Sequence, residues 1–468
     1  MANPTTPTPG LAVTNVCESS RISEEINPTE MDSVGTRRCR PWGLRTWRVA
    51  APHRATRMSV AKSEAAALTE QVSPVIQSQV DSSVLNFAIG QPGPELLASA
   101  YAMIKKASAE AFEDDKNFPW IMQYGAECGP AHYREALAGF YTRNSLCQTS
   151  PSEVILTTGV SGGIQMMCST LASPGDVAIV EQPSYFLARD IFASLGLETL
   201  KAPMTSSGSI DFAALSAEVD ALESVGKRVR LLYVVPVHGN PTAVCKTREE
   251  KEAIVEWCER RKVYALCDEV YELLNFGKRR VDSPPMRDLS RGQHVVSLGS
   301  FSKICGPGLR LGWALASPEV VERFKQNGVL SSGGGLNPLG GAIMAKAMEP
   351  REGAEPLMDD LLLRNVCPTL SRKSRALCAS IDRHLAPRGV TYARPEGGYF
   401  VFLRLPEGVD ATELLETARS EFQVGYTPGE RCLGPKNTAR LSFAFYSEEE
   451  MELGVTRLAA ALDNYLAG

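Results

Sequence analysis

A lysine and an arginine stand close together in the stretch Ser300–Trp313, directly after an apolar run. The run Val295–Leu298 is short and mostly apolar, and a polar segment broken by glycines follows it, so it is predicted to be a buried strand. Lys303 then lies at a strand end, among hydroxyl and small side chains. A lysine in that place is a candidate to form a Schiff base with a carbonyl compound. The alternative is that Lys303 is a loop lysine and Arg310 a surface charge.

Two more polar residues follow apolar runs. Leu231–Val235 leads into a Pro-Val-His-Gly-Asn-Pro-Thr turn that contains Asn240, and Val263–Cys267 leads to Asp268. An unpaired carboxylate at the end of a buried strand is costly, so Asp268 requires a positive partner. A protonated pyridine nitrogen is a suitable one, because each charge stabilises the other. As a bare residue, Asp268 is equally compatible with a helix N-cap.

A glycine-rich turn and a late arginine are candidate anion sites. The predicted strand Val154–Thr158 runs into Gly-Val-Ser-Gly-Gly, which opens a predicted helix and exposes backbone N–H groups that suit a phosphate. The alternative is a tight strand-to-helix connection. Arg440 stands at the start of an apolar strand, where a planar guanidinium can hold a carboxylate through two parallel hydrogen bonds. Considered alone, such an arginine is more often a surface or salt-bridge residue.

Taken in their order along the sequence, these motifs resemble those of the class I/II pyridoxal-phosphate aminotransferases of fold type I. The resemblance rests on Ser-x-Ser-Lys at 300–303 and Gly-Leu-Arg-x-Gly-Trp at 308–313, and it runs from about Phe87 to the C-terminus. The residues of these motifs, together with Gly-Gln-Pro at 90–92, are most similar to those of the 2-aminoadipate/multisubstrate branch of the family. Two positions depart from the family: Ala243 replaces a usual glycine, and Gly163 stands where the family often has a larger residue.

The resemblance implies a role for each matching residue. Lys303 would be the catalytic residue that carries pyridoxal 5'-phosphate as a Schiff base and moves the proton. The implied cofactor-binding residues are Tyr124, Ser161, Gly162, Tyr185, Asn240, Asp268, Tyr271, Ser300, Ser302, Lys303 and Arg310. The implied substrate-binding residues are Gly90, Asn240 and Arg440. Tyr124 would reach the cofactor phosphate of the other subunit, which implies a symmetric homodimer with shared active sites.

The predicted reaction moves an amino group from an L-amino acid to a 2-oxo acid, with 2-oxoglutarate as the favoured acceptor. One alternative with the same cofactor is a C–S lyase or another eliminating enzyme, since motifs do not show how the reaction ends. Another is a transcription regulator that senses pyridoxal phosphate. Such a regulator carries a winged-helix module ahead of this domain, and residues 1–80 show no two-helix pattern with a turn.

Composition and charge limit the classes of partner that the chain is expected to bind. A net charge of -5 provides no general attraction to nucleic acid or membranes, and no apolar run is long enough to span a bilayer. The 12 cysteines form no Cys-x-x-Cys pair and the five histidines are scattered, so neither a metal site nor a disulfide framework is predicted. The expected partners are therefore small-molecule substrates and a second copy of the chain.

The alternation of strands and helices predicts an α/β fold with a mostly parallel central sheet flanked by helices. The length of 468 residues suits two domains and a tail. The aminotransferase domain is predicted at 81–465. Within it, residues 100–350 form the large cofactor-binding domain, and residues 81–99 and 351–468 form a smaller α+β domain.

Residues 1–80 are predicted to be a disordered extension. They begin rich in threonine and proline, and a later stretch carries seven arginines from Arg37 to Arg57 without any acidic residue. Arginine-rich, acid-poor segments are typical of transit peptides, although the acidic residues ahead of this one argue against that interpretation. The expected location is cytoplasmic, or mitochondrial or plastid if the segment is a transit peptide. An uninformative tail is the alternative.

Overall fold

The structure is a computed structural model, and it describes residues 83–114, 120–145, 148–277, 284–289, 293–333 and 335–467. The predicted extension at 1–80 lies outside the described residues. Within the described residues, no helix is both long enough and apolar enough to cross a membrane. The cysteines in this part of the chain are free thiols.

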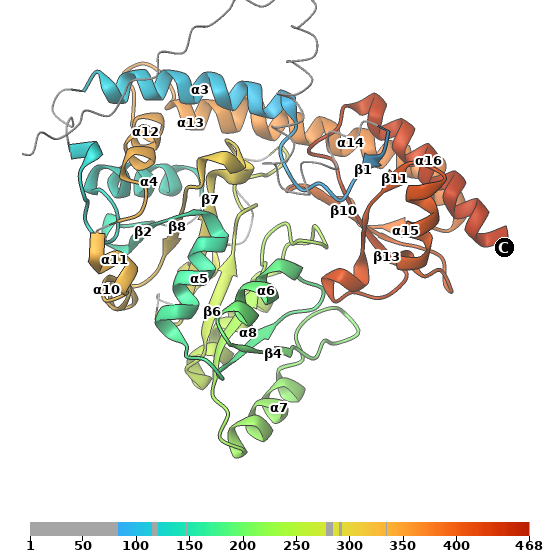
Figure 1. Cartoon of the computed structure of the whole chain (residues 1–468), viewed down its shortest axis with the longest axis horizontal. Coiled ribbons are helices and arrows are strands. Elements are labelled where there is room, and N and C mark those ends of the chain that lie inside the picture. Colours follow the sequence, from blue (N-terminus) through green and yellow to red (C-terminus); the bar gives the residue numbers. More distant parts are fainter. Residues whose placement is uncertain are drawn as a thin grey trace, which may run out of the picture. The chain divides into compact units, whose positions relative to one another are not determined.

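The centre of the fold is a seven-stranded sheet (Figure 1). In spatial order its strands are β2 (Val154–Thr157), β8 (Gly312–Leu315), β7 (Val295–Ser300), β6 (Tyr264–Asp268), β5 (Val229–Val234), β3 (Val177–Val180) and β4 (Glu198–Lys201). Strand β8 is antiparallel to both of its neighbours, and the other pairs are parallel. The predicted mostly parallel sheet is confirmed.

Helices cover both faces of this sheet, as predicted. Along β3, Ala178 and Val180 join the hydrophobic cluster on one face, whereas Val177 and Ile179 join the cluster on the other. Alternate strand residues point to opposite faces, so β3 is buried on both sides. The helices of this part are α4 (Ala131–Asn144), α5 (Gly159–Leu171), α6 (Phe186–Ser194), α7 (Phe212–Ser224), α8 (Arg248–Arg261), α9 (Met286–Leu289), α10 (Pro318–Lys325), α11 (Gly328–Gly333) and α12 (Pro338–Met348).

The C-terminal part forms a small sheet with helices beside it. Its strands, in spatial order, are β12 (Thr427–Pro428), β13 (Thr438–Ser442), β10 (Phe400–Arg404) and β9 (Thr391–Tyr392). Separately, β1 (Leu85–Asn86) pairs in parallel with β11 (Val424–Gly425), so the first described residues lie beside the C-terminal part (Figure 1). The helices here are α13 (Leu357–Asp360), α14 (Cys367–His384), α15 (Ala411–Ser420) and α16 (Glu448–Ala467).

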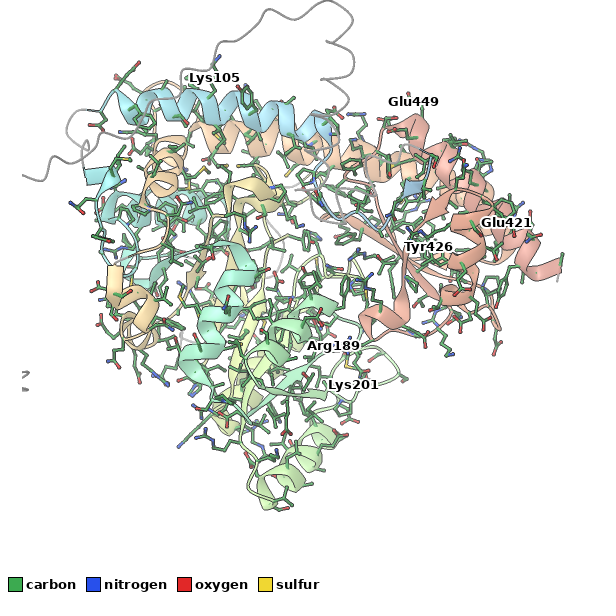
Figure 2. The ribbon with its side chains drawn as sticks, viewed as in Figure 1. Lys105, Arg189, Lys201, Glu421, Tyr426 and Glu449 are labelled. Atoms are coloured by element: carbon green, nitrogen blue, oxygen red, sulfur yellow. The ribbon has the colours of Figure 1, made fainter. Side chains whose placement is uncertain are left out.

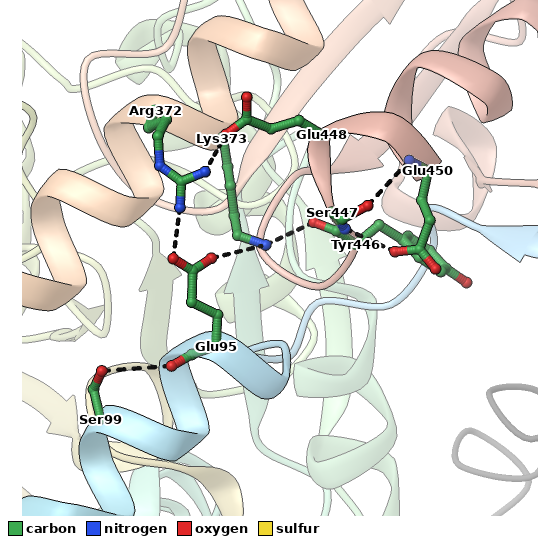
Figure 3. Close-up of polar contacts among 8 residues, drawn as sticks. All are labelled: Glu95, Ser99, Arg372, Lys373, Tyr446, Ser447, Glu448 and Glu450. Atoms are coloured by element: carbon green, nitrogen blue, oxygen red, sulfur yellow. Dashed lines mark hydrogen bonds and ion pairs between the residues drawn. The ribbon is translucent and has the colours of Figure 1, made fainter.

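Helix α3 (Pro94–Phe112) connects this early segment to the rest of the fold and runs continuously across residues 99–100, where a domain boundary was predicted. Polar contacts join its first turn to α14 and to the start of α16 (Figure 3). Arg372 lies 2.6 Å from Glu95 and also pairs with Glu448. Lys373 Nζ donates to the Tyr446 carbonyl at 2.6 Å.

Short single turns complete the described chain, and three of them border the site. The 3₁₀ turns are η1 (Trp120–Met122), η2 (Pro151–Glu153), η3 (Phe301–Lys303), η4 (Pro307–Leu309), η6 (Ala386–Arg388) and η7 (Gly429–Cys432), and η5 (Leu361–Val366) is a π-helical turn. Turns η3 and η4 lie between β7 and β8, and η7 lies between β12 and β13.

Candidate active site

A cavity of about 370 Å³ brings most of the predicted site residues together. Several of them come from the carboxyl ends of β6 and β7, where ligands bind in open α/β sheets, and others come from the small sheet. All of the predicted site residues except Gly162 and Tyr124 line this cavity: Gly90, Ser161, Tyr185, Asn240, Asp268, Tyr271, Ser300, Ser302, Lys303, Arg310 and Arg440. Residues separated by more than 300 positions in the sequence therefore share one site.

Lys303 occupies the last position of η3, which follows β7 directly. The Ser300 hydroxyl caps this turn by accepting the Ser302 N–H. Lys303 Nζ donates to the Gly90 carbonyl at 2.6 Å, and the Tyr399 hydroxyl donates to the Lys303 carbonyl at 2.6 Å. Burial and the nearby positive charge of Arg440 lower the pKa of Lys303 to about 8. About a tenth of the amine is therefore neutral, and nucleophilic, at pH 7.

Asp268 is the last residue of β6 and is 4% exposed. Its carboxylate accepts a hydrogen bond from the Tyr233 hydroxyl at 2.7 Å. Burial raises the pKa of Asp268 to about 6, although the hydrogen bond from Tyr233 and the charge of Lys303 act in the opposite direction. A carboxylate in such a place is stabilised by a cationic ring nitrogen that enters the cavity.

The amino end of α5 forms an anion-binding wall. Helix α5 begins at Gly159, and its N-cap residue Thr158 makes no side-chain capping hydrogen bond, so first-turn N–H groups remain available to a ligand. Arg310 Nη2 donates to the Thr158 carbonyl at 3.1 Å, which holds the guanidinium at this helix end. A Cβ atom at Gly162 would lie 1.9 Å from Thr158 Oγ1, so this position requires glycine for close packing.

The hydroxyl side chains beside this helix end add hydrogen-bonding groups. Ser161 lies in the first turn of α5 and lines the cavity, as do Ser300 and Ser302 after β7. The Ser300 hydroxyl donates to Ser302 Oγ at 2.9 Å, so the two side chains are held next to each other. The amino end of α5, these hydroxyl groups and the Arg310 guanidinium together suit a phosphate group.

Arg440 is the most constrained cation of the site, at 4% exposure in the middle of β13. Its Nη1 donates to Asn240 Oδ1 at 2.7 Å and its Nη2 to the Ala88 carbonyl at 2.9 Å. The guanidinium lies 4.3 Å from the centre of the Phe400 ring. Its Nε is buried without a hydrogen-bond partner, so an acceptor from a ligand would satisfy it.

The family described as aminotransferase class I and II matches residues 82–458. The chain belongs to this family. It is 31% identical to the 2-aminoadipate transaminase of Thermus thermophilus over 397 residues, which are 82% of this chain and 91% of that protein. The resemblance to aminotransferases drawn from the motifs is confirmed.

Solved structures agree with this assignment. The crystal structure of the multiple substrate aminotransferase from Thermococcus profundus superposes with a TM-score of 0.73 at 27% identity, covering 85% of this chain and 96% of that one. The Thermus thermophilus alpha-aminoadipate aminotransferase, complexed with N-(5'-phosphopyridoxyl)-L-leucine, superposes with a TM-score of 0.69 at 29% identity, covering 84% and 96%. This chain is therefore an aminotransferase of fold type I.

Pyridoxal phosphate, the cofactor of this aminotransferase family, fits the residues in the cavity. Lys303 provides a low-pKa amine for the aldehyde, and Asp268 provides a buried carboxylate for the ring nitrogen. The end of α5 with Arg310 would hold the phosphate. Tyr185 and Tyr271 also line the cavity, and their contacts with the ring stay predictions from the family resemblance. Burial raises the pKa of Tyr185 to about 12, so its phenol stays protonated.

Tyr124 lies apart from this cavity in its own chain. Its side chain is 81% exposed, which is among the highest values for the large hydrophobic side chains of the described residues. For an aromatic residue predicted to contact the cofactor, such exposure is compatible with a role at a second subunit.

The motif analysis missed His238, which supports the loop that carries Asn240. The Asn275 side-chain amide donates to the Glu272 carbonyl at 2.7 Å, so its oxygen is left to accept from His238 Nε2 at 2.8 Å. His238 Nδ1 then accepts from the Cys245 thiol at 3.3 Å. Burial lowers the pKa of His238, so its imidazole stays neutral between Asn275 and Cys245.

His238 also touches the segment before β10. A Cβ atom at Gly397 would lie 2.2 Å from His238 Nε2, and one at Gly398 would lie 2.9 Å from His238 Cβ. These glycines therefore allow the Asn240 loop to pack under the segment that presents Tyr399 and Phe400. The sequence contains one hint of this, the position of His238 two residues before Asn240.

Proposed function

We propose that this aminotransferase takes the amino group of an L-amino acid and delivers it to 2-oxoglutarate, in a homodimer with shared active sites. The observation that carries the proposal is that Lys303, Asp268 and Arg440 line one cavity. A basic amine, a partner for a cationic ring and a carboxylate-binding guanidinium are the groups that amino-group transfer requires. The likeness to a 2-aminoadipate transaminase supports a dicarboxylic substrate.

Arg440 and Asn240 bind and orient the substrate. The guanidinium and amide are already joined at 2.7 Å, and both residues line the cavity. A substrate α-carboxylate that meets this pair has one orientation fixed by two charge-assisted hydrogen bonds. The Phe400 ring beneath Arg440 holds the guanidinium plane, so little side-chain entropy is lost on binding.

Lys303 moves the proton. When bound, pyridoxal phosphate supplies the carbonyl group that accepts the amino group and the ring that takes up the electron pair left on the substrate Cα. The Lys303 amine, with its pKa lowered to about 8, can take a proton from the substrate Cα near neutral pH and would give it up at C4′ of the bound cofactor. The Gly90 carbonyl accepts from Nζ at 2.6 Å and holds the amine in place between these transfers.

The exposed apolar side chains beside η1 and α3 support a dimer. Tyr124, Tyr101, Met122 and Val329 are each more than 60% exposed, so they are available to a second subunit. A two-fold interface over these residues would cover them and bring the partner subunit's Tyr124 toward the cavity.

The test is the visible absorbance of the purified protein with pyridoxal phosphate, before and after a panel of L-amino acids and then 2-oxoglutarate. The expected result is conversion of the bound cofactor to its amine form by a donor and reversal by 2-oxoglutarate. Lys303→Ala should abolish the visible band of the wild type and lower turnover at least about 100-fold. Lys201→Met, at an exposed lysine on β4, is the matched control.

Three outcomes would contradict the proposal or a part of it. Release of pyruvate from cystathionine without any 2-oxo acid acceptor would instead show a C–S lyase. A cofactor band that exchanges with no amino acid, together with shifts of genomic DNA fragments in a gel, would show a sensor. Full activity of a monomer in sedimentation and dilution assays would contradict the shared-site dimer.

A further inference from the structure

A single carboxylate, that of Glu181, holds both ends of the Asn240 loop, which comprises residues 236–246. Glu181 directly follows β3 and is 5% exposed. Its Oε1 accepts from the Val235 N–H at 2.5 Å, just before the loop begins. Its Oε2 lies 2.7 Å from Lys246 Nζ, at the last residue of the loop. One buried side chain from β3 therefore fixes where the loop leaves the sheet and where it returns.

The Asn240 loop is closed by its own backbone hydrogen bonds. The Lys246 N–H donates to the Pro236 carbonyl at 2.9 Å, and the Gly239 N–H donates to the Val244 carbonyl at 3.0 Å. These bonds make the loop one compact unit rather than a slack connection. A displacement of its ends therefore displaces the Asn240 side chain as well.

The backbone of the loop has a shape that its residues do not favour. His238 has a φ of 47° and Ala243 a φ of 61°, both in the left-handed region that glycine adopts without steric cost. Ala243 stands where the family usually has glycine. Contacts from outside the loop have to maintain this shape. The bond between His238 and Asn275 is one of them, and the carboxylate of Glu181 is another.

The ion pair between Glu181 and Lys246 is shielded from water. The Lys246 side chain is 14% exposed. Burial lowers the pKa of Lys246, but the charge of Glu181 and its hydrogen bond outweigh burial, so the pKa lies above its ordinary value. Glu250, the other acid that acts on Lys246, caps α8 through the Thr247 N–H. Removal of either partner of this pair leaves a buried charge unpaired.

The segment that follows Glu181 also reaches the site. Tyr185, four residues later, lines the cavity. The Ser184 N–H donates to the Cys432 carbonyl at 2.8 Å, which fastens this segment to η7. Figure 2 shows Arg189 of the following helix, α6, on the side that faces the C-terminal part. The carboxylate of Glu181 therefore ties together two segments that line the cavity.

We propose that Glu181 is a positioning residue, which holds Asn240 in the place beside Arg440 that substrate binding requires. This inference rests on the proposed function, in which Asn240 and Arg440 bind the substrate α-carboxylate. Glu181 is not among the residues that line the cavity, so it acts through Asn240, whose Oδ1 accepts from Arg440 Nη1 at 2.7 Å. A displaced loop removes this partner from Arg440 and weakens the binding of every amino acid.

The test measures the affinity of the holoenzyme for 2-aminoisobutyrate by absorbance titration. This amino acid carries an α-carboxylate but no hydrogen on Cα, so its binding is read without amino-group transfer. Glu181→Gln keeps an acceptor for the Val235 N–H and loses the charge that pairs with Lys246. Its Kd should rise about 10-fold, and KM for a reacting donor should rise by a similar factor while kcat changes much less. Lys246→Arg keeps the pair and should remain near the wild type.

A double variant separates positioning from stability. Glu181→Gln combined with Lys246→Met leaves no unpaired buried charge, so its melting temperature should recover relative to Lys246→Met alone. The contact that holds the loop end is still absent, so the Kd for 2-aminoisobutyrate should stay raised. Arg143→Met is the matched control, since it breaks the ion pair with the buried Asp359 outside the cavity. It should lower the melting temperature and leave the Kd unchanged.

Two results would overturn the role of Glu181. One is an unchanged Kd in Glu181→Gln. The other is a Kd that recovers together with the melting temperature in the double variant, which would show that the unpaired charge alone caused the defect. Absence of amino-group transfer, with the Kd still raised in Glu181→Gln, would overturn only the proposed function.

Discussion

The Tyr233 hydroxyl donates to Asp268 Oδ2 at 2.7 Å, and both residues are buried on neighbouring parallel strands. Tyr233 lies within β5 opposite Leu266, and Asp268 ends β6 two residues further on, so the strand register brings the two side chains near each other. Burial raises the pKa of Asp268, and the hydrogen bond from Tyr233 opposes that rise. Tyr233 therefore keeps the carboxylate charged at a position where desolvation favours the neutral acid.

Tyr233→Phe should move the pH dependence of cofactor binding. Without the phenol donor, the pKa of Asp268 rises above about 6, so the carboxylate is lost at a higher pH on acidification. Apoenzyme is titrated with pyridoxal phosphate at several pH values between 5.5 and 8. In Tyr233→Phe, the loss of affinity on acidification should begin at a higher pH than in the wild type. Tyr426→Phe, which loses a hydrogen bond to Ala411 far from Asp268, is the control. Identical acid limbs in Tyr233→Phe and wild type would contradict this role.

The rate of cofactor loading should rise with pH and reach half of its maximum near pH 8. Only the neutral Lys303 amine attacks an aldehyde, and burial with the charge of Arg440 lowers its pKa to about 8. Stopped-flow absorbance after mixing apoenzyme with pyridoxal phosphate measures this profile. Arg440→Met removes a positive neighbour, so its midpoint should lie at a higher pH. A midpoint near the ordinary lysine pKa in wild type would refute the placement of Lys303.

Arg440→Lys should weaken substrate binding while leaving cofactor binding intact. A lysine cannot replace the bidentate guanidinium, and it also loses the stacking on Phe400. The expected rise in KM is about 10- to 100-fold for every amino acid, since each carries an α-carboxylate. Steady-state kinetics with two donors of different side chains measures it. A rise limited to dicarboxylic donors would instead place the distal carboxylate on Arg440.

His238→Ala should raise KM for the amino acid by misplacing Asn240. The substitution breaks the hydrogen bonds to Asn275 and Cys245 and leaves their buried groups unpaired, at a stability cost of about 1–3 kcal/mol. Thermal unfolding and kinetics together separate the two effects. His238→Asn, which retains a donor and an acceptor, should recover more of the KM than of the melting temperature. Equal recovery of both would indicate a purely structural residue.

The local elements followed from the sequence because their periodicity is local. The apolar run Val177–Val180 coincides with β3, and the run at 231–235 overlaps β5, which starts at Val229. Strand ends after such runs placed Asp268 and Lys303 correctly at one edge of a parallel sheet. Both conclusions depend only on residues within a few positions of each other.

The tertiary structure decided which distant segments meet. Strand β8 lies antiparallel between β2 and β7, and the sequence of its four residues does not predict that pairing. Arg440 meets Asn240 across 200 residues of sequence, and Arg431 stacks on Phe186 through a turn outside any motif. Composition, motif order and strand ends thus determined the fold class and the candidate residues, whereas long-range packing selected the contacts of His238, Tyr233 and Arg431. The reason is physical: such contacts arise from the burial of whole surfaces against each other, which no short stretch of sequence encodes.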